Sequence, residues 1–194
     1  MIAHSFYFLR HGETQWNEKR LLQGQEDTPL NAQGRQQMQS SAMILKSYPI
    51  DVIVGSPLGR VVEAIGLINQ TLQKPVELSA GLMERDWGIF QGMNDAQIAE
   101  WKKSNNWIED PDEPSILRAT SPPKGEKYQD FKNRTLEIVE CKTDQYPDQN
   151  ILFVAHGHTF RLLCQELLGR DHISPHGGCY HFKNTKPHWE LECL

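Results

Sequence analysis

The sequence predicts an α/β fold, a three-layer α/β/α sandwich around a mostly parallel central sheet. Two observations lead to this prediction. First, the runs DVIVG at 51–55 and ILFVA at 151–155 are almost continuously apolar, which is typical of central parallel strands buried on both faces. Second, a helical pattern follows each run, and strands that alternate with helices form a parallel sheet with helices on both sides.

The N-terminal elements come in a regular order. A first strand is expected at 5–9 (SFYFL), followed by a loop at 23–29 that is rich in Gln, Gly, Asp and Pro. Asn31 can then cap a helix that runs to about Ser47, because a short polar side chain accepts hydrogen bonds from the first turn. The apolar residues on one face of this helix are Met38, Ala42 and Leu45.

The second strand leads directly into a second helix. Ser56 and Pro57 follow the strand and are interpreted as the N-cap and the first-turn proline. The apolar residues of this helix, spaced four, three and four apart, are Val61, Ile65, Ile68 and Leu72. Residues 75–78 are expected to form a short third strand.

The C-terminal part repeats the strand-and-helix order. After the strand at 151–155, a helix is expected to begin near His156-Gly157 and to end at Gly169. Two short strands are expected near 179–182 and 188–193.

We expect one domain over 1–194, with a lid or insert at about 93–126. The stretch at 105–125, NNWIEDPDEPSILRATSPPKG, is rich in Pro, Asp and Ser and too irregular for a core. It is interpreted as a long surface loop, a kind of segment that often carries specificity.

Composition excludes several classes of protein. The 194 residues carry a net charge of -5 without a block of Lys or Arg, which argues against nucleic-acid binding. No apolar run reaches membrane-spanning length, and the N-terminus lacks the basic and small-residue features of a signal peptide. The four cysteines form no CxxC motif, which favours reduced thiols over a disulfide framework. We therefore expect a cytoplasmic protein.

Three strand ends carry related polar residues. The first strand ends in Arg10 and His11, the second leads within one helical turn to Arg60, and the fourth ends in His156. Because ligands bind at the carboxyl ends of the strands in an open parallel sheet, these side chains are expected to converge. Arginine forks match phosphate or carboxylate oxygens in pairs, so the sequence predicts an anion site.

The same residues suggest phosphoryl transfer. A histidine among cations stays neutral, so His11 can attack phosphorus in line if a backbone carbonyl, for instance, pins its other ring nitrogen. Arg10, Arg60 and His156 would hold the three equatorial oxygens of the transition state. Gly12 would let the backbone turn sharply and approach the ligand.

A further residue must protonate the leaving oxygen. Glu84, in a loop past the third strand, is the preferred candidate, because a bound phosphate raises the pKa of a facing carboxyl. Glu13 is the rival carboxylate, since it is closer to His11 in the sequence. His158 is interpreted as a surface residue at a helix start.

The ordered set of motifs resembles the histidine phosphatase superfamily, the phosphoglycerate-mutase-like group. The motifs are LRHGET with Trp16-Asn17 and Gly24, DTPL at 27–30, SPLGR at 56–60, Glu84 with Gly88 and Gly92, and His156-Gly157. The resemblance covers nearly the whole chain. It implies a phosphohistidine on His11, a phosphate pocket of Arg10, Arg60 and His156, an acid at Glu84, polar help from Asn17, and no metal or other cofactor.

Within this resemblance, a phosphatase is favoured over a phosphoglycerate mutase. Mutases carry Lys where this chain has Asp95 and Tyr where it has Trp87, and they carry an arginine pair in the insert. Here that region offers Lys102-Lys103 and an isolated Arg118, alongside the acidic residues Glu109, Asp110, Asp112 and Glu113. Such an acidic lid is a poor receptor for a doubly anionic phosphoglycerate. The sequence also shows no tail of the kind with which mutases shield the phosphoenzyme. The expected substrate is a small phosphate ester such as a sugar phosphate, a phosphoserine or a nucleotide-precursor phosphate.

Three further points concern a loss of catalysis, a metal site and the charge of Arg60. A phosphate-binding module without catalysis is disfavoured, because the nucleophile, both arginines and a candidate acid are all present. The spacing of His172, His176, Cys179 and His181 allows a zinc site, although Cys179 and His181 can equally be neighbours on one sheet face. Glu63, close to Arg60 in the sequence, could compete for its charge.

Overall fold

The computed structural model describes residues 2–108 and 122–194. Its centre is a six-stranded sheet in the order β3-β2-β4-β1-β5-β6. The strands are β1 (Phe6–Arg10), β2 (Val52–Gly55), β3 (Val76–Leu78), β4 (Ile151–Ala155), β5 (Cys179–Asn184) and β6 (Trp189–Cys193). The four strands β1, β2, β3 and β4 run parallel to one another, whereas β5 and β6 add an antiparallel edge next to β1. The predicted mostly parallel sheet is confirmed.

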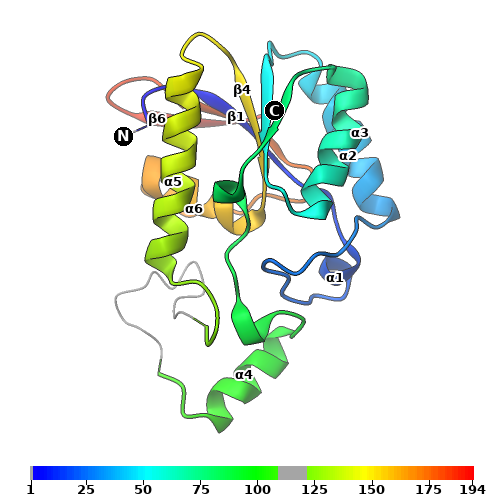
Figure 1. The fold of residues 1–194 in the computed structure, drawn as a ribbon, viewed down its shortest axis with the longest axis vertical. Coiled ribbons are helices and arrows are strands. Elements are labelled where there is room, and N and C mark those ends of the chain that lie inside the picture. The colour runs from blue at the N-terminus through cyan, green and yellow to red at the C-terminus, as the bar shows by residue number, and fades with distance from the viewer. Residues whose placement is uncertain (1, 109–121) are drawn as a thin grey trace.

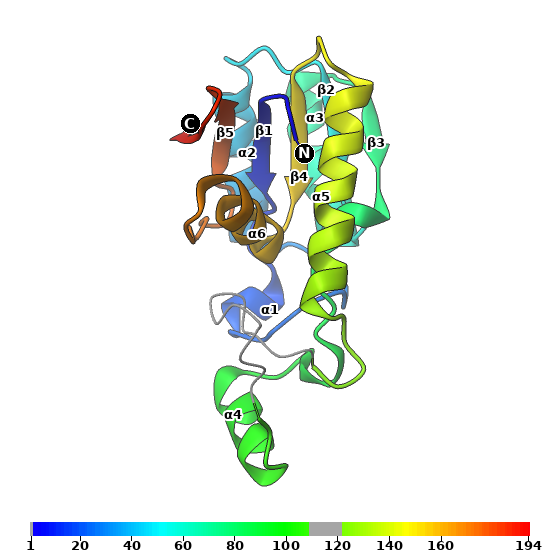
Figure 2. The ribbon, with the colours of Figure 1, turned by 90° about the vertical axis from the view of Figure 1, so that its left-hand side faces the viewer.

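Helices cover both faces of this sheet (Figures 1 and 2). The longer helices are α2 (Ala32–Leu45), α3 (Gly59–Leu72), α5 (Tyr128–Gln145) and α6 (Gly157–Leu168). Helices α2 and α3 pack on one face with the side chains of one strand parity, including Leu9 and Val154. Helices α5 and α6 pack on the other face with the opposite parity, including Phe8 and Phe153. Side-chain alternation along each strand thus supplies two cores and three layers.

Four shorter elements complete the described part of the chain. They are α1 (Gln15–Glu18), α4 (Asp95–Ser104) and two 3-10 turns, η1 (Ala80–Leu82) and η2 (Gly88–Phe90). In Figure 1, α4 lies beyond the end of the sheet that also carries α1. Trp101 of α4 packs with Phe90 and Trp107, so the two tryptophans form a small satellite core. No membrane-crossing helix occurs among residues 2–108 and 122–194, since none is both long and apolar enough.

Two helix starts test the capping predictions. The side chain of Asn31 accepts a hydrogen bond from Gly34 N at the start of α2, as predicted. The prediction for Ser56 and Pro57 is wrong, because α3 begins later, with Leu58 as its N-cap residue and no cap from its side chain. Instead, the carboxylate of Asp27 accepts from Gly59 N at 2.7 Å and from Arg60 N at 3.3 Å.

Only part of the insert predicted at about 93–126 lies within the described residues. Its first part contains α4, a helix that the sequence reading did not anticipate. Most of the irregular stretch at 105–125, with the acidic residues at 109, 110, 112 and 113, lies outside the described residues.

Candidate active site

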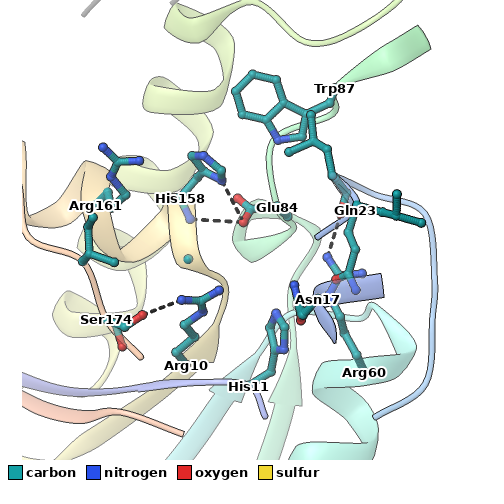
Figure 3. Close-up of a pocket in the computed structure, with 15 residues that line it drawn as sticks. Arg10, His11, Asn17, Gln23, Arg60, Glu84, Trp87, His158, Arg161 and Ser174 are labelled. Carbon is teal, nitrogen blue, oxygen red and sulfur yellow. Dashed lines mark hydrogen bonds and ion pairs between the residues drawn. The ribbon is translucent and has the colours of Figure 1, made fainter. Parts of the chain in front are cut away.

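The neighbouring strands β2, β4 and β1 run parallel, so their carboxyl ends lie side by side at one edge of the sheet. His11 N donates to Ala155 O at 3.1 Å, and Arg10 N donates to Gly178 O at 3.1 Å. The backbone that carries both side chains is therefore fixed by β4 on one side and by the turn before β5 on the other. Figure 3 shows the resulting cluster around the cavity.

His11 is held as a neutral imidazole. Its side chain is 3% exposed, and Nδ1 lies 2.7 Å from Gly12 O. Because a carbonyl oxygen only accepts, Nδ1 carries the hydrogen and Nε2 keeps its lone pair. Burial and the charges of Arg60 and Arg10 lower the pKa of His11 well below its usual range, despite the opposing Gly12 contact. The structure therefore has the pinned, neutral imidazole that the sequence predicts at this position.

Gly12 is packed tightly against another part of the backbone. A Cβ on Gly12 would lie 2.3 Å from Gly34 O, in the first turn of α2, and its expected approach to a ligand stays a prediction. Conversely, a Cβ on Gly34 would lie 2.0 Å from Glu13 O. The two glycines let helix α2 pack directly against the backbone that follows His11.

Arg10 and Arg60 are buried and held largely by backbone carbonyls. Arg10 donates to Ser174 O and contacts His176 Nε2 at 2.8 Å. Arg60 donates to Glu26 O at 2.8 Å and to Gly24 O at 2.6 Å. Burial lowers the pKa of Arg60 to about 10, and it also lowers the pKa of Arg10.

Each guanidinium keeps an unsatisfied donor. The Nε atoms of Arg10 and Arg60 are buried and have no hydrogen-bond partner in the described part of the chain. A buried donor without a partner costs free energy, about 1–3 kcal/mol for a neutral group and more for a charged one. Both arginines line the same cavity, so an anion bound there would lie against two cations.

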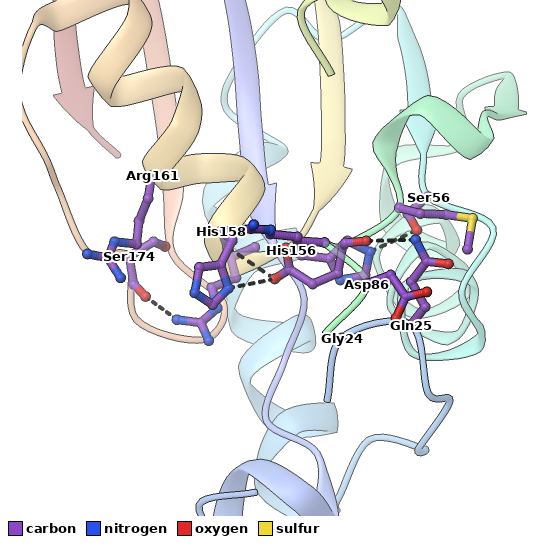
Figure 4. A network of polar contacts seen from close by, with 12 residues as sticks. Gly24, Gln25, Ser56, Asp86, His156, His158, Arg161 and Ser174 are labelled. Atoms are coloured by element: carbon purple, nitrogen blue, oxygen red, sulfur yellow. Dashed lines mark hydrogen bonds and ion pairs between the residues drawn. The ribbon is translucent and has the colours of Figure 1, made fainter. Parts of the chain in front are cut away.

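His156 lies behind His11. It is completely buried, and its ring centroid is 5.2 Å from that of His11 in an edge-on arrangement. Its Nε2 contacts Ser56 Oγ at 2.8 Å, whereas its Nδ1 is buried without a partner among the described residues. Burial, followed by the charge of Arg60, lowers its pKa well below the usual range. Figure 4 shows the contact with Ser56.

Glu84 faces the same site from the loop after η1. Its Oε1 accepts from Arg85 N at 3.0 Å, and its Oε2 accepts from His158 N at 3.1 Å. From α5, Arg134 holds this loop by donating to Gly81 O, Met83 O and Glu84 O.

The contacts of Glu84 determine its protonation. Burial acts to raise its pKa, but the charge and hydrogen bonds of His158 and the N–H of Arg85 outweigh burial and lower the pKa to about 2. The contacts that the chain itself supplies thus hold Glu84 as a carboxylate, and the rise expected beside a bound phosphate stays a prediction. The rival carboxylate Glu13 accepts from Asn31 Nδ2 at 2.6 Å and borders a different hollow.

A cavity of about 220 Å³ lies between these groups. Of the predicted site residues, those lining it are Arg10, His11, Asn17, Arg60 and Glu84, whereas His156 is not among the lining residues. The side-chain oxygen of Asn17 accepts a hydrogen bond from Thr14 N, and this contact does not involve the amide nitrogen Nδ2.

The cavity also contains residues that the sequence reading did not assign to the site. They are Gln23, Trp87, His158, Arg161 and Ser174. The interpretation of His158 as a surface residue is wrong, since its side chain is 17% exposed and touches Glu84. Its position two residues after His156, in the first turn of α6, was the available signal.

The residues considered for a zinc site make other contacts in the structure. His181 stacks on Tyr7 at 4.2 Å on the same sheet face as Cys179, and His176 reaches Arg10. The described residues contain no group of three or more His, Cys, Asp or Glu arranged to hold a metal ion.

Glu63 does not compete for Arg60. Its carboxylate accepts from Leu30 N at 3.1 Å and pairs with Arg35 at 2.7 Å. It therefore joins α3 to the start of α2, away from the arginine cluster.

Comparison with known proteins adds an independent observation. The family model described as histidine phosphatase superfamily (branch 1) matches residues 6–186. This chain belongs to that superfamily. Among its curated relatives in the superfamily is "Uncharacterized phosphatase PhoE" of Bacillus subtilis, 30% identical, with 84% of this chain and 77% of PhoE covered. Another is "Probable phosphoglycerate mutase GpmB" of Escherichia coli, 31% identical, with 84% of this chain and 74% of GpmB covered.

Solved structures of other proteins share the fold. YhfR of Bacillus stearothermophilus superposes with a TM-score of 0.84 at 22% identity, covering 98% of this chain and 96% of YhfR. The alpha-ribazole phosphatase from Shigella flexneri superposes with a TM-score of 0.80 at 25% identity, covering 98% and 95%. The predicted phosphoglycerate-mutase-like α/β/α architecture is confirmed.

Proposed function

We propose that this chain is a metal-independent phosphatase that hydrolyses small phosphomonoesters through a covalent phosphohistidine on His11. One observation carries the proposal. A neutral imidazole, pinned through Nδ1, lies beside two buried arginines whose Nε donors have no partner among the described residues. This arrangement suits a nucleophile that attacks phosphorus while fixed charges hold the phosphoryl oxygens.

The proposed reaction has two steps. In the first, His11 Nε2 attacks phosphorus in line, and Arg10 and Arg60 stabilise the charge on the equatorial oxygens. The buried, unpartnered Nδ1 of His156 supports its role as a further donor to these oxygens. Glu84 delivers a proton to the leaving oxygen. In the second step a water attacks the phosphohistidine, and Glu84 takes up a proton as general base.

The cavity lining supports Asn17 as an additional phosphate contact, because its amide nitrogen is not used by the Thr14 contact. The partner is then a small phosphate ester, and neither nucleic acid nor membrane is required. The name of the Shigella relative makes alpha-ribazole phosphate one reasonable member of a substrate panel.

A cofactor-dependent phosphoglycerate mutase is the second candidate. The likeness to GpmB, whose name carries that activity, favours it. Trp87 and Asp95 depart from the mutase pattern, and Trp87 is buried at the cavity wall. These departures support the phosphatase proposal.

The test is a steady-state assay of the purified chain in EDTA. Hydrolysis of p-nitrophenyl phosphate is measured beside conversion of 3-phosphoglycerate to 2-phosphoglycerate, with His11→Ala for comparison. We expect hydrolysis that is lost in His11→Ala and no isomer formation. Rapid isomer formation would favour the mutase, and neither activity across a broad ester panel would favour a phosphate-binding module without catalysis.

A further inference from the structure

We propose that His158 holds the proton that Glu84 delivers to the leaving oxygen, and so acts as a positioning and proton-holding residue. This inference rests on the proposed phosphatase function. Two contacts carry it: His158 N donates to Glu84 Oε2 at 3.1 Å, and His158 Nδ1 lies 3.3 Å from the same oxygen. Figure 3 shows both contacts beside the cavity.

The orientation of the pair is fixed from several sides. The side chains of His158 and Glu84 are only 17% and 9% exposed. The His158 ring packs edge-on against Trp87, with centroids 5.0 Å apart. Because Trp87 is itself buried and the backbone of His158 is part of α6, the imidazole cannot turn away from the carboxylate without breaking this packing.

Glu84 alone is poorly suited to donate a proton. Two backbone N–H groups and the His158 ring stabilise it as a carboxylate, with a pKa lowered to about 2 against the effect of burial. A carboxylate near neutral pH has no proton to give, so the proton must be stored on a neighbour. Imidazole is the side chain that exchanges a proton near neutral pH.

The charges around the pair come from four elements. The groups that face it are Arg10 from β1, Arg60 from α3, Arg134 from α5, and Arg161 of α6 with Asp171 after it. Arg161 is held in a fork by Asp171, with contacts of 2.9 and 2.7 Å. In the described part of the chain, His158 is the titratable group with a side-chain contact to the Glu84 carboxylate.

The proton balance of the first step follows from this geometry. A dianionic phosphate ester enters beside the His158 imidazolium and the Glu84 carboxylate. Its charge favours transfer of the Nδ1 proton to Oε2, which leaves a neutral imidazole and a neutral carboxylic acid. As the bond from His11 Nε2 to phosphorus forms and the P–O bond breaks, the leaving oxygen keeps the bonding pair and takes the proton from Glu84. In the second step, the attacking water returns a proton through Glu84 to His158.

The test compares esters with different leaving groups in wild type and His158→Gln. Glutamine can still donate a hydrogen bond to Glu84, but it cannot hold an additional proton. General acid catalysis contributes roughly 10²–10⁴-fold, and it matters most for strongly basic alkoxides. We expect about a 100-fold loss of kcat for an alkyl phosphate and less than about a threefold loss for p-nitrophenyl phosphate.

His4→Gln is the matched control, since His4 is a partly exposed histidine 4.0 Å from the carboxylate of Asp144, away from the cavity. It should behave as wild type with both esters. If His158→Gln does not fold, as judged by circular dichroism, His158→Asn takes its place.

Equal losses with both esters, or no loss with either, would overturn the inference, because a structural role does not depend on leaving-group basicity. Failure of the proposed function is recognised separately, as wild type that neither turns over p-nitrophenyl phosphate nor forms phosphohistidine in a quenched reaction. That result would remove the inference as well.

Discussion

The close contact between Gly12 and Gly34 predicts how much stability is lost when either glycine is replaced by alanine. Gly34→Ala places a Cβ 2.0 Å from Glu13 O, and Gly12→Ala places one 2.3 Å from Gly34 O. Ordinary contact begins at 3.4 Å, so the two backbones must separate by more than 1 Å in either variant. Neither neighbour is a flexible side chain, so the cost should resemble that of overpacking, about 1–3 kcal/mol of the free energy of unfolding.

The same shift should also reduce catalysis. Glu13 follows Gly12 and His11 directly, so movement of this backbone displaces His11, the proposed nucleophile, and a 1 Å misplacement can cost about 100-fold in rate. Urea unfolding measures the first effect, and kcat for p-nitrophenyl phosphate measures the second.

Gly66→Ala is the matched control. Gly66 lies within α3, and a Cβ there would meet nothing within 4 Å. Replacing this glycine should stabilise the protein by about 0.5–1 kcal/mol through helix propensity. The reasoning would be refuted if Gly34→Ala were as stable and as active as wild type.

Three further predictions concern the groups that surround the anion site. Asp27→Ala removes the cap of α3 and should cost about 0.5–2 kcal/mol in urea unfolding, with a control Asp144→Ala near zero. The folded pKa of Glu84 is lowered to about 2 from an ordinary 4.5, so its contribution to stability is complete above pH 4.5 and is lost as the pH falls towards 2. An acid titration followed by circular dichroism should show a smaller loss in that window for Glu84→Gln; an unchanged curve would contradict this. Gly157→Ala places a Cβ 3.1 Å from Arg10 Cζ and should weaken inhibition by inorganic phosphate about tenfold, or about 1.4 kcal/mol, while unfolding changes little.

The fold was predictable where a local pattern coincides with a tertiary role. The continuous apolar runs at 51–55 and 151–155 are the central strands, because burial on both faces requires such runs. Asn31 caps α2 through a hydrogen bond within its own turn. The cap of α3 could not be found in this way, since Asp27 reaches Gly59 across 32 positions of the chain.

The candidate site, like the fold, could be predicted from the sequence only in part. Strand-end topology brought His11, Arg10 and Arg60 together, and the structure places all three at one cavity. The protonation of Glu84 was not readable from the sequence, because it depends on His158, which lies 74 positions away. No motif states which of two histidines, at 156 and 158, faces the acid and which packs behind the nucleophile.

The way in which the active-site groups are held has a consequence for how this site can change. Arg60 is held by the carbonyls of Gly24 and Glu26, and Arg10 in part by that of Ser174. Arg134 is held by the carbonyls of Gly81, Met83 and Glu84. A point substitution alters a side chain but leaves the carbonyl in place. The anion site is therefore buffered against single substitutions at Glu26, Met83 and Ser174, and changes of loop length are the mutations that would redirect it.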